Sequence, residues 1–493
     1  MVQVVSAPDF SDLFLNRNRP LQEQLYQSLT EWIVSGRLVK NSKLPSSRRM
    51  SASLNISRNT VIHVIEQLKK EGFLIGKAGK GVYVSQNLPY GAMELASHIS
   101  PGEKHTEISL PSLSDFTEAM KSRPRLKSRW PTLLPFSPGV PDLKSFPFPI
   151  WNKIYRQHQD RIPISGYGDP AGYLALRESL AEHLLASRGV RCTSDQVIIT
   201  NGRQEALNIC AQTILNYGDT VLMENPCYRG ARFAFNMKNA KVNLIELKEN
   251  RLDVGQLLKK NIKAKLIYTT ATYQHPMGGV LPLKERSNLL DWAEKSNCWI
   301  LEDESNGTLS FEEKPIAALQ GMKKNTSVIF IGSFCRTLLP SLRLGYIIAP
   351  KPVAPSFIDT KSMLSGPCNL LHQAVLADFI NDGHYVRHIR KMQNNYQEKW
   401  AHFCQLIRTH LEPDIHLIKS SAAMFVIIKT PGYDDVFLSE KLIERGFGNS
   451  PLSLSDANKS KISGLVLGCA NTTQLQRLHF VKYLAKLIKK YKP

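Results

Sequence analysis

The 493-residue sequence has few cysteines, a shortage of acidic residues and no long apolar run. Its 8 cysteines are scattered, without a Cys-x-x-Cys pair or zinc-ligand spacing, which indicates reduced thiols and excludes a disulfide framework. No apolar run approaches the roughly 20 residues that a membrane helix requires. The first residues lack the basic and apolar segments of a signal peptide. We therefore expect a cytoplasmic protein with no membrane partner and no metal site.

The shortage of acid leaves a strongly basic chain. It carries 63 Lys+Arg against 42 Asp+Glu, a formal net charge of +21. Such an excess favours nucleic acid or another polyanion as a partner, although charge alone does not predict a fold. The length allows two to four domains, and no internal repeat or low-complexity tract interrupts it.

The first ninety residues predict three short helices and a hairpin. Apolar positions recur at helical spacing from Pro20, and Gly36 ends that pattern. A second helix begins near Ser46 and Ser47, and a third begins at Ser57, because serine is a preferred N-cap residue. Two short β-rich pieces between residues 73 and 84 follow, joined by a basic turn. The pattern is typical of a winged helix-turn-helix over residues 1–88.

A winged helix places the start of its third helix in the major groove and its hairpin along the phosphates. The sequence puts Arg58, Asn59 and Thr60 at that helix start, where they would meet base edges. It puts Arg48, Lys77 and Lys80 where they would neutralise phosphates. The alternative is a three-helix packing module whose charges are merely solvated.

Residues 89–130 lose periodicity and gain Ser, Pro, Gly and Thr, which predicts a linker. A basic run within it, from Lys121 to Arg129, is either solvated or in contact with DNA or the second domain. From residue 131 onward, strands alternate with amphipathic helices, which predicts an α/β domain with a largely parallel sheet. The expected strands are Val197–Thr200, Val221–Glu224, Leu266–Thr269, Trp299–Glu302, Val328–Ile331 and Tyr346–Ala349.

Ligands of such sheets bind at the carboxyl ends of the strands. Gly202 follows one strand and opens a helix, where free N–H groups favour a phosphate, although an ordinary turn would look the same. Asp303 follows another strand and would pair with a protonated ring nitrogen, or be a surface acid. Tyr228 would stack on a flat ring or belong to the core. Ser333 and Arg343 would together hold a phosphate, although such an arginine is more often part of a surface ion pair.

The N-terminal region resembles the DNA-binding domain of the GntR family. The stretches Leu44-Pro-Ser-Ser-Arg48, Ser57-Arg-Asn-Thr-Val61 and Glu71-Gly72 carry the resemblance. It implies that Arg48, Arg58 and the wing glycine Gly81 lie at the DNA, and the predicted interface also includes Ser46, Ser47 and Ser57. Asn41 replaces the family's usual glycine at a turn, where asparagine tolerates a left-handed conformation.

The region from Phe136 to the C-terminus resembles the aminotransferase-like domain of MocR-type regulators, which have the fold-type I architecture of enzymes that depend on pyridoxal phosphate (PLP). Motifs in the family's order include Ser137–Asp142, Gly166–Gly172, Gln274–Gly278 and residues 327–349. The resemblance implies that Asp303 faces the pyridine nitrogen and Tyr228 packs on the ring. It also implies that the phosphate is held by Gly202, Arg203, Gln204, Ser333 and Arg343.

Departures from the family pattern cluster at the reactive end of the ring. Arg336 stands where the family has the lysine that forms a Schiff base with PLP, and a guanidinium cannot form that imine. Ser305 replaces a tyrosine, Cys335 replaces a serine, and the aromatic and imidazole positions of residues 273–277 are exchanged. Either the pocket binds PLP or a relative without a covalent bond, or it takes another anion or none.

These observations predict a transcription regulator without catalytic residues. The winged helix would bind a double-stranded operator near the bacterial nucleoid, and the larger domain would sense a small molecule. The resemblance to the MocR-type regulators implies that the chain forms a head-to-tail homodimer. Two other hypotheses are a PLP enzyme with a DNA-binding arm and a constitutive DNA-binding dimer with an inactive sensor domain. The sequence names neither the effector nor the operator.

Overall fold

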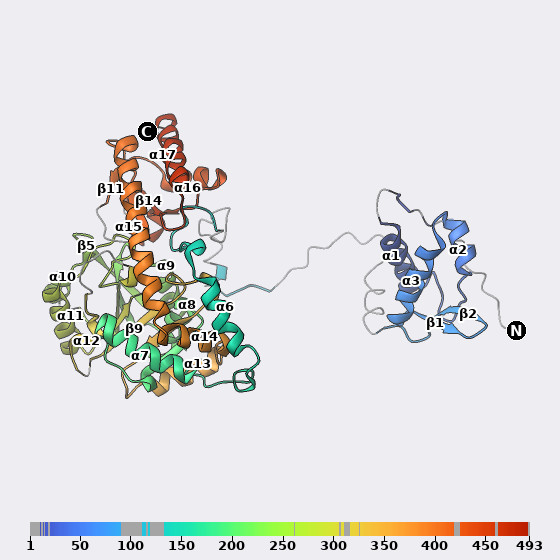
Figure 1. The fold of residues 1–493 in the computed structure, drawn as a ribbon, viewed down its shortest axis with the longest axis horizontal. Helices are drawn as coiled ribbons and strands as arrows, with labels where there is room; N and C mark the ends of the chain where they lie inside the picture. The colour runs from blue at the N-terminus through green and yellow to red at the C-terminus, as the bar shows by residue number, and fades with distance from the viewer. Residues whose placement is uncertain are drawn as a thin grey trace. The chain divides into compact units, whose positions relative to one another are not determined.

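The computed structural model describes residues 10, 13, 15–17, 20–89, 111–114, 117–118, 133–260, 262–304, 307–309, 316–324, 326–418, 424–458 and 462–491. The chain divides into two compact units, Met1–Ser114 and Asp115–Pro493, both drawn in Figure 1. Most of the predicted linker 89–130 lies outside the described residues, as do its basic run and Ser305.

The N-terminal unit is a winged helix, as the sequence predicts. Helix α1 buries Leu25, Leu29, Trp32 and Ile33, and α3 buries a matching apolar stripe, so the helices share one core. The two wing strands pair antiparallel. The elements are α1 (Leu21–Val34), α2 (Ser47–Leu54), α3 (Arg58–Lys70), β1 (Leu74–Lys77) and β2 (Gly81–Val84).

The larger unit is built on an eight-stranded mixed sheet with the order β3-β10-β9-β8-β7-β4-β5-β6. Its central strands run parallel, from β9 through β8, β7 and β4 to β5. Strand β10 is antiparallel to both of its neighbours, which the alternation of the sequence does not reveal. The strands are β3 (Val197–Thr200), β4 (Thr220–Asn225), β5 (Lys241–Lys248), β6 (Arg251–Leu252), β7 (Leu266–Thr269), β8 (Trp299–Asp303), β9 (Val328–Ser333) and β10 (Gly345–Ile348).

Helices cover both faces of this sheet. One face packs on α8, α9 and α13, and the other on α7, α10, α11 and α14. The helices are α6 (Phe148–His158), α7 (Leu174–Arg188), α8 (Arg203–Ile214), α9 (Arg229–Met237), α10 (Val254–Lys260), α11 (Leu283–Lys295), α12 (Leu319–Met322), α13 (Ala354–Leu364) and α14 (Leu370–Asn381). Since side chains alternate along a strand, neighbouring residues of β8 reach opposite layers.

A second, four-stranded antiparallel sheet lies toward the C-terminus, and the sequence did not predict it. Figure 1 shows the 28-residue helix α15 running from the large sheet's helices to this smaller layer. Among the described residues, no helix combines the length and the apolar content that a membrane-spanning segment needs. The elements are α15 (His384–Leu411), β11 (His416–Leu417), β12 (Phe425–Lys429), α16 (Asp435–Glu444), β13 (Ser450–Pro451), β14 (Gly464–Gly468) and α17 (Gln474–Lys490).

Candidate functional site

Serine hydroxyls fix the helix starts at the candidate DNA face. The Ser46 hydroxyl accepts from the Arg49 N–H at 3.3 Å, and the Ser57 hydroxyl accepts from the Thr60 N–H at 3.1 Å. Both are N-caps of the kind that the sequence predicts. The Arg58 guanidinium donates to the Ser47 hydroxyl at 3.3 Å, which ties the start of α3 to α2. In this structure the three serines hold the helices in place and orient Arg58.

The basic side chains of this face are solvent-exposed. The exposed residues include Arg48, Arg58, Asn59, Lys77, Lys80 and Gly81, and Gly81 is the first residue of the wing strand β2. A groove between α2, α3 and the wing adds Lys43 and Lys69, which the sequence analysis missed because neither lies in a recognisable motif. Asn41 has a φ of 63°, the left-handed conformation that we expected of it. The charges of the face therefore point outward, where they can meet phosphates.

The candidate ligand site of the larger unit lies where three strands end. Strand β8 ends at Asp303, its parallel neighbour β9 ends at Ser333, and β3 leads into the turn at Gly202. Arg343 donates to the Asn201 carbonyl at 3.1 Å. A Cβ at Gly202 would lie 3.4 Å from the Arg343 guanidinium carbon, so the glycine allows close contact. The predicted phosphate residues are thus brought to one edge of the sheet.

The Arg203 side chain lies at the centre of this edge. Its guanidinium carbon is 3.5 Å from the centroid of the Tyr228 ring, and its Nη1 is 3.5 Å from Asp303 Oδ2. The Asp303 side chain is fully buried and that of Arg203 is 10% exposed. Asp303 also accepts a hydrogen bond of 2.8 Å from the Tyr268 hydroxyl. Gln204 turns away and donates to the Gly230 carbonyl at 2.9 Å.

Tyr268 was missed from the sequence because it lies inside a predicted strand. It pairs in register with Leu301, two residues before Asp303, so both side chains project from the same face of the sheet. The alternation of side-chain direction along a strand was therefore the sequence signal that could have identified Tyr268. Burial and the neighbouring Asp303 raise the pKa of Tyr268 well above its usual range, so its hydroxyl stays protonated and donates.

Arg336 reaches the same site from the loop after β9. Its Nη1 is buried and has no hydrogen-bond partner among the described residues. Gly139, with a φ of 80°, lies against it: a Cβ there would come within 3.2 Å of the Arg336 Nε. Burial and the Arg203 charge lower the pKa of Arg336 to about 10, which leaves it protonated at neutral pH. Burial, Arg336 and Arg203 hold the pKa of His275 well below its usual range, so His275 is neutral.

Two family models match the chain along these units. The model for bacterial regulatory proteins of the gntR family matches residues 21–84, and that for aminotransferase class I and II matches residues 132–451. The probable rhizopine catabolism regulatory protein MocR of Rhizobium meliloti is 33% identical over 92% of this chain and 90% of its own. The chain belongs to the MocR-type regulators of the GntR family. The regulator TauR of Rhodobacter capsulatus is 30% identical over 76% of this MocR-type chain and 77% of its own.

The aminotransferase-like unit of this MocR-type chain also matches solved enzymes. An archaeal alanine:glyoxylate aminotransferase aligns with a TM-score of 0.69 and 25% identity, over 77% of this chain and 96% of that one. The kynurenine aminotransferase of Pyrococcus horikoshii aligns with a TM-score of 0.68 and 22% identity, over 79% of this chain and 98% of that one. These matches confirm the predicted fold-type I architecture, which is a PLP-binding fold.

The site of this MocR-type chain fits only one end of PLP. The residues that the resemblance assigns to the phosphate, the Gly202 turn, Ser333 and Arg343, lie together at one sheet edge. The ring end is not free, because Arg203 stacks on Tyr228 and reaches Asp303, the two residues that would contact a pyridine ring. With these side chains in place, PLP does not fit.

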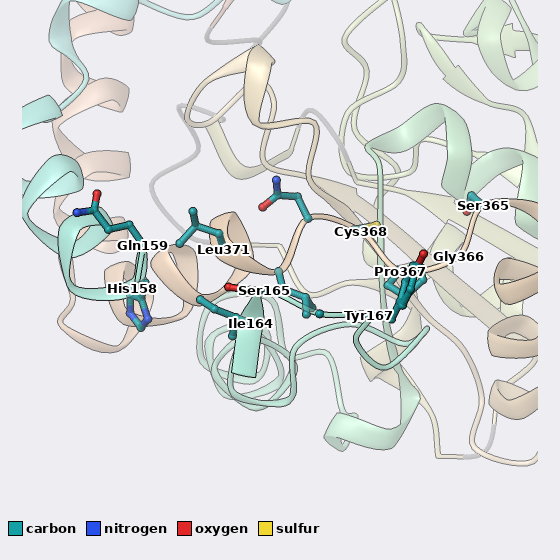
Figure 2. Close-up of a pocket in the computed structure, with 13 residues that line it drawn as sticks. His158, Gln159, Ile164, Ser165, Tyr167, Ser365, Gly366, Pro367, Cys368 and Leu371 are labelled. Carbon is teal, nitrogen blue, oxygen red and sulfur yellow. The ribbon is translucent and has the colours of Figure 1, made fainter. Parts of the chain in front are cut away.

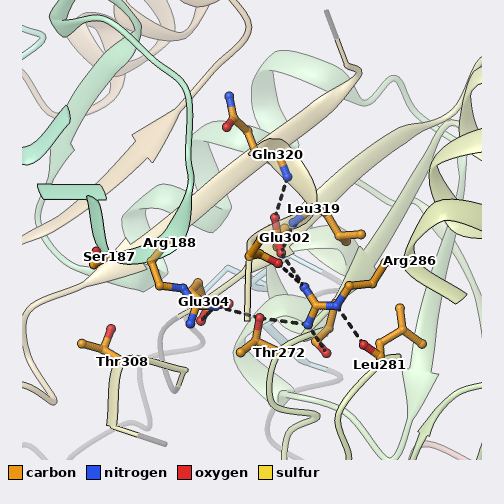
Figure 3. A network of polar contacts seen from close by, with 12 residues as sticks. Ser187, Arg188, Thr272, Leu281, Arg286, Glu302, Glu304, Thr308, Leu319 and Gln320 are labelled. Carbon is orange, nitrogen blue, oxygen red and sulfur yellow. Dashed lines mark hydrogen bonds and ion pairs between the residues drawn. The ribbon is translucent and has the colours of Figure 1, made fainter. Parts of the chain in front are cut away.

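The opposite face of β8 carries a buried charge network rather than a ligand site (Figure 3). Glu302 accepts from the N–H groups of Leu319 and Gln320, and Arg286 donates to three backbone carbonyls. Glu304 pairs with Arg188. Burial and the neighbouring Glu304 raise the pKa of Glu302 to about 7. The network holds the end of β8, and with it Asp303, in place.

A separate surface pocket involves the Gly166–Gly172 motif. Figure 2 shows Ser165 and Tyr167 on one side and Gly366, Pro367 and Cys368 nearby. Tyr167 is fully exposed, and Ile162 and Met363, on the flanking segments, are 85% and 86% exposed. The described residues contain no group of three or more His, Cys, Asp or Glu arranged to hold a metal ion.

Proposed function

We propose that this MocR-type protein is a DNA-binding transcription regulator whose aminotransferase-like unit senses a small anion without a covalent PLP–lysine bond. The observation that carries the proposal is Arg336, a half-buried arginine with a buried Nη1, at the position that the resemblance assigns to the family's lysine. A guanidinium is a poor nucleophile and stays protonated, so it forms no imine. That excludes the aldimine exchange that a transaminase needs, and it disfavours the hypothesis of a PLP enzyme with a DNA-binding arm.

The proposed DNA interface is the exposed face of the winged helix. Arg58, Asn59 and Thr60 would contact base edges from the start of α3, as the cap at Ser57 orients that turn. The remaining proposed contacts go mainly to phosphates and come from Ser46, Ser47, Arg48, Lys77, Lys80 and Gly81. The exposure of the basic members supports this assignment, since a packing module would not require an outward basic face.

We infer that the regulator acts as a homodimer in the bacterial cytoplasm, associated with the nucleoid. Support for the dimer comes from Ile162, Tyr167 and Met363, which are apolar or aromatic and almost fully exposed in the single chain. Large exposed apolar side chains gathered near one pocket are typical of a protein interface. A dimer would present two winged helices to paired half-sites.

Effector binding would have to favour one arrangement of the dimer over another, because a ligand shifts an equilibrium only by its differential affinity for the two states. The residues proposed to meet the effector are Gly202, Arg203, Gln204, Tyr228, Asp303, Ser333, Arg336 and Arg343. A non-covalently bound PLP relative would need Arg203 to leave its present place.

Selection of duplexes from a random library by the full-length chain tests this function. We expect enrichment of one sequence made of two related half-sites, bound with an affinity that falls steeply as salt rises. No enrichment above random DNA would contradict the regulator assignment. Enrichment of a single half-site, with one chain bound per duplex, would contradict the dimer.

A further inference from the structure

The place that a pyridine ring takes in this fold is filled by a side chain of the chain itself. Arg203 lies on the Tyr228 ring at stacking distance and directs one N–H edge toward Asp303. A guanidinium shares with a protonated pyridine its flat shape, its positive charge and its in-plane donors. Arg203 therefore satisfies the two residues that would otherwise contact the ring.

A second, half-buried cation lies beside the first. Arg336 Nη1 has no hydrogen-bond partner among the described residues, and its charge and that of Arg203 repel one another. An unpaired buried donor costs free energy, and two like charges in a cleft add to that cost. An oxyanion between the two guanidinium groups would remove both penalties, because carboxylates and phosphates accept forked hydrogen bonds from arginine.

A third cation lies at the rim. Arg343 is exposed and lies against the Gly202 turn, where α8 begins. The Asn201 N–H donates to Glu205, but no side chain caps α8 at Gly202, so the first N–H groups of the helix and its dipole favour a second anionic group there. Two carboxylates lie among these groups: Asp303, which Arg203 and the Tyr268 hydroxyl both contact, and Glu205, which accepts from Asn201 beside the turn. Three arginines against two carboxylates leave the site with an excess of one positive charge.

We propose that the site binds a small organic dianion in place of PLP. One carboxylate or phosphate would lie between Arg336 and Arg203, and the second anionic group would lie at the Gly202 turn and Arg343. Arg203 would stay where a pyridine ring would otherwise lie, and its guanidinium would contact the dianion. This rests on the proposed function, since it names the chemical class of the effector that the regulator would sense.

Calorimetric titration of the full-length chain with succinate, inorganic phosphate and PLP tests the proposal. We expect succinate or phosphate to bind the wild type, and the difference between them identifies a carboxylate or a phosphate ligand. Arg336→Gln should weaken that binding about 10- to 100-fold, as expected for a lost charge-assisted hydrogen bond. Arg336→Lys keeps the charge without the fork and should fall in between. Arg251→Gln removes a half-buried arginine of the same unit that pairs with Glu249 and Glu285, and it should leave the affinity for each ligand unchanged.

The titration with PLP distinguishes the proposed dianion site from a pocket that binds PLP. Arg203→Ser empties the ring position, so it should increase PLP affinity about tenfold or more while weakening succinate or phosphate binding. Tighter binding of PLP than of both anions by the wild type would overturn the proposal. So would the absence of any anion binding, or equal anion affinity in Arg336→Gln and the wild type when circular dichroism shows both folded.

These failures are distinguishable from failure of the proposed function. Loss of anion binding in Arg336→Gln, with operator binding unchanged, would support both the proposed ligand class and the regulator assignment. Anion binding without any operator selection would overturn the regulator assignment and leave the ligand class standing.

Discussion

The proposed assignment as a regulator rather than an enzyme depends on a single residue, Arg336, and on the side chains around it. The sequence identifies Arg336, Asp303 and Tyr228 correctly as parts of one region, because each lies near the end of a predicted strand. The stacking of Arg203 on Tyr228 could not be predicted. Its sequence position indicates a helix start, but the direction of a long side chain depends on the contacts around it.

At the DNA face, the residue that we expect to matter most for specificity is Arg58. Arg58→Ala should weaken binding to the selected operator by about 1–3 kcal/mol, the value typical of a lost base contact. Fluorescence anisotropy with the operator and with a scrambled duplex measures both the loss and its specificity. Lys70→Ala, at the opposite end of α3, is the matched control and should leave the preference for the operator unchanged.

Equal weakening of Arg58→Ala on operator and scrambled DNA would show that Arg58 contacts only the backbone. The Ser47 hydroxyl that now accepts from Arg58 would then hold the arginine for a phosphate rather than a base.

At the scale of elements, the six predicted strands are all present, because each is a buried apolar run between turn signals. The direction of β10 was not predictable, since a local pattern does not encode the direction of a partner strand. Strand β5 was missed because it is not a continuous apolar run, although polar and apolar residues alternate along most of it, around the buried Ile245. The C-terminal sheet was missed although β12 and β14 are apolar runs, because no regular alternation with helices marks them.

The buried network behind β8 predicts a pH dependence of stability. Burial and Glu304 raise the pKa of Glu302 above its unfolded value to about 7. The contribution of Glu302 to the free energy of unfolding is therefore greatest at low pH, and it is lost as the pH rises through about 7. In Glu302→Gln, the calorimetric melting temperature of the larger unit should therefore decline less between about pH 5 and pH 8 than in the wild type.

Glu440→Gln, which replaces a half-buried glutamate of α16, is a control and should follow the wild-type profile. If the melting temperature of Glu302→Gln declined with pH in parallel with that of the wild type, Glu302 would already be ionised throughout this pH range.

For the whole molecule, the net charge of +21 and the winged helix agree with a protein that binds DNA through phosphates and recognises a sequence through a few bases. The larger unit has the fold of an aminotransferase, and Arg336 and Arg343 follow the end of its strand β9. A fold does not determine a reaction; the site does.

The absorbance spectrum of the full-length chain during a PLP titration tests the central claim, the absence of a covalent PLP bond, most directly. We predict no imine band that saturates at one PLP per chain, and no stoichiometric lysine adduct by mass spectrometry after borohydride reduction. An imine band that saturates at one per chain and disappears in Asp303→Ala would contradict the account, because it would place a reactive lysine in this site.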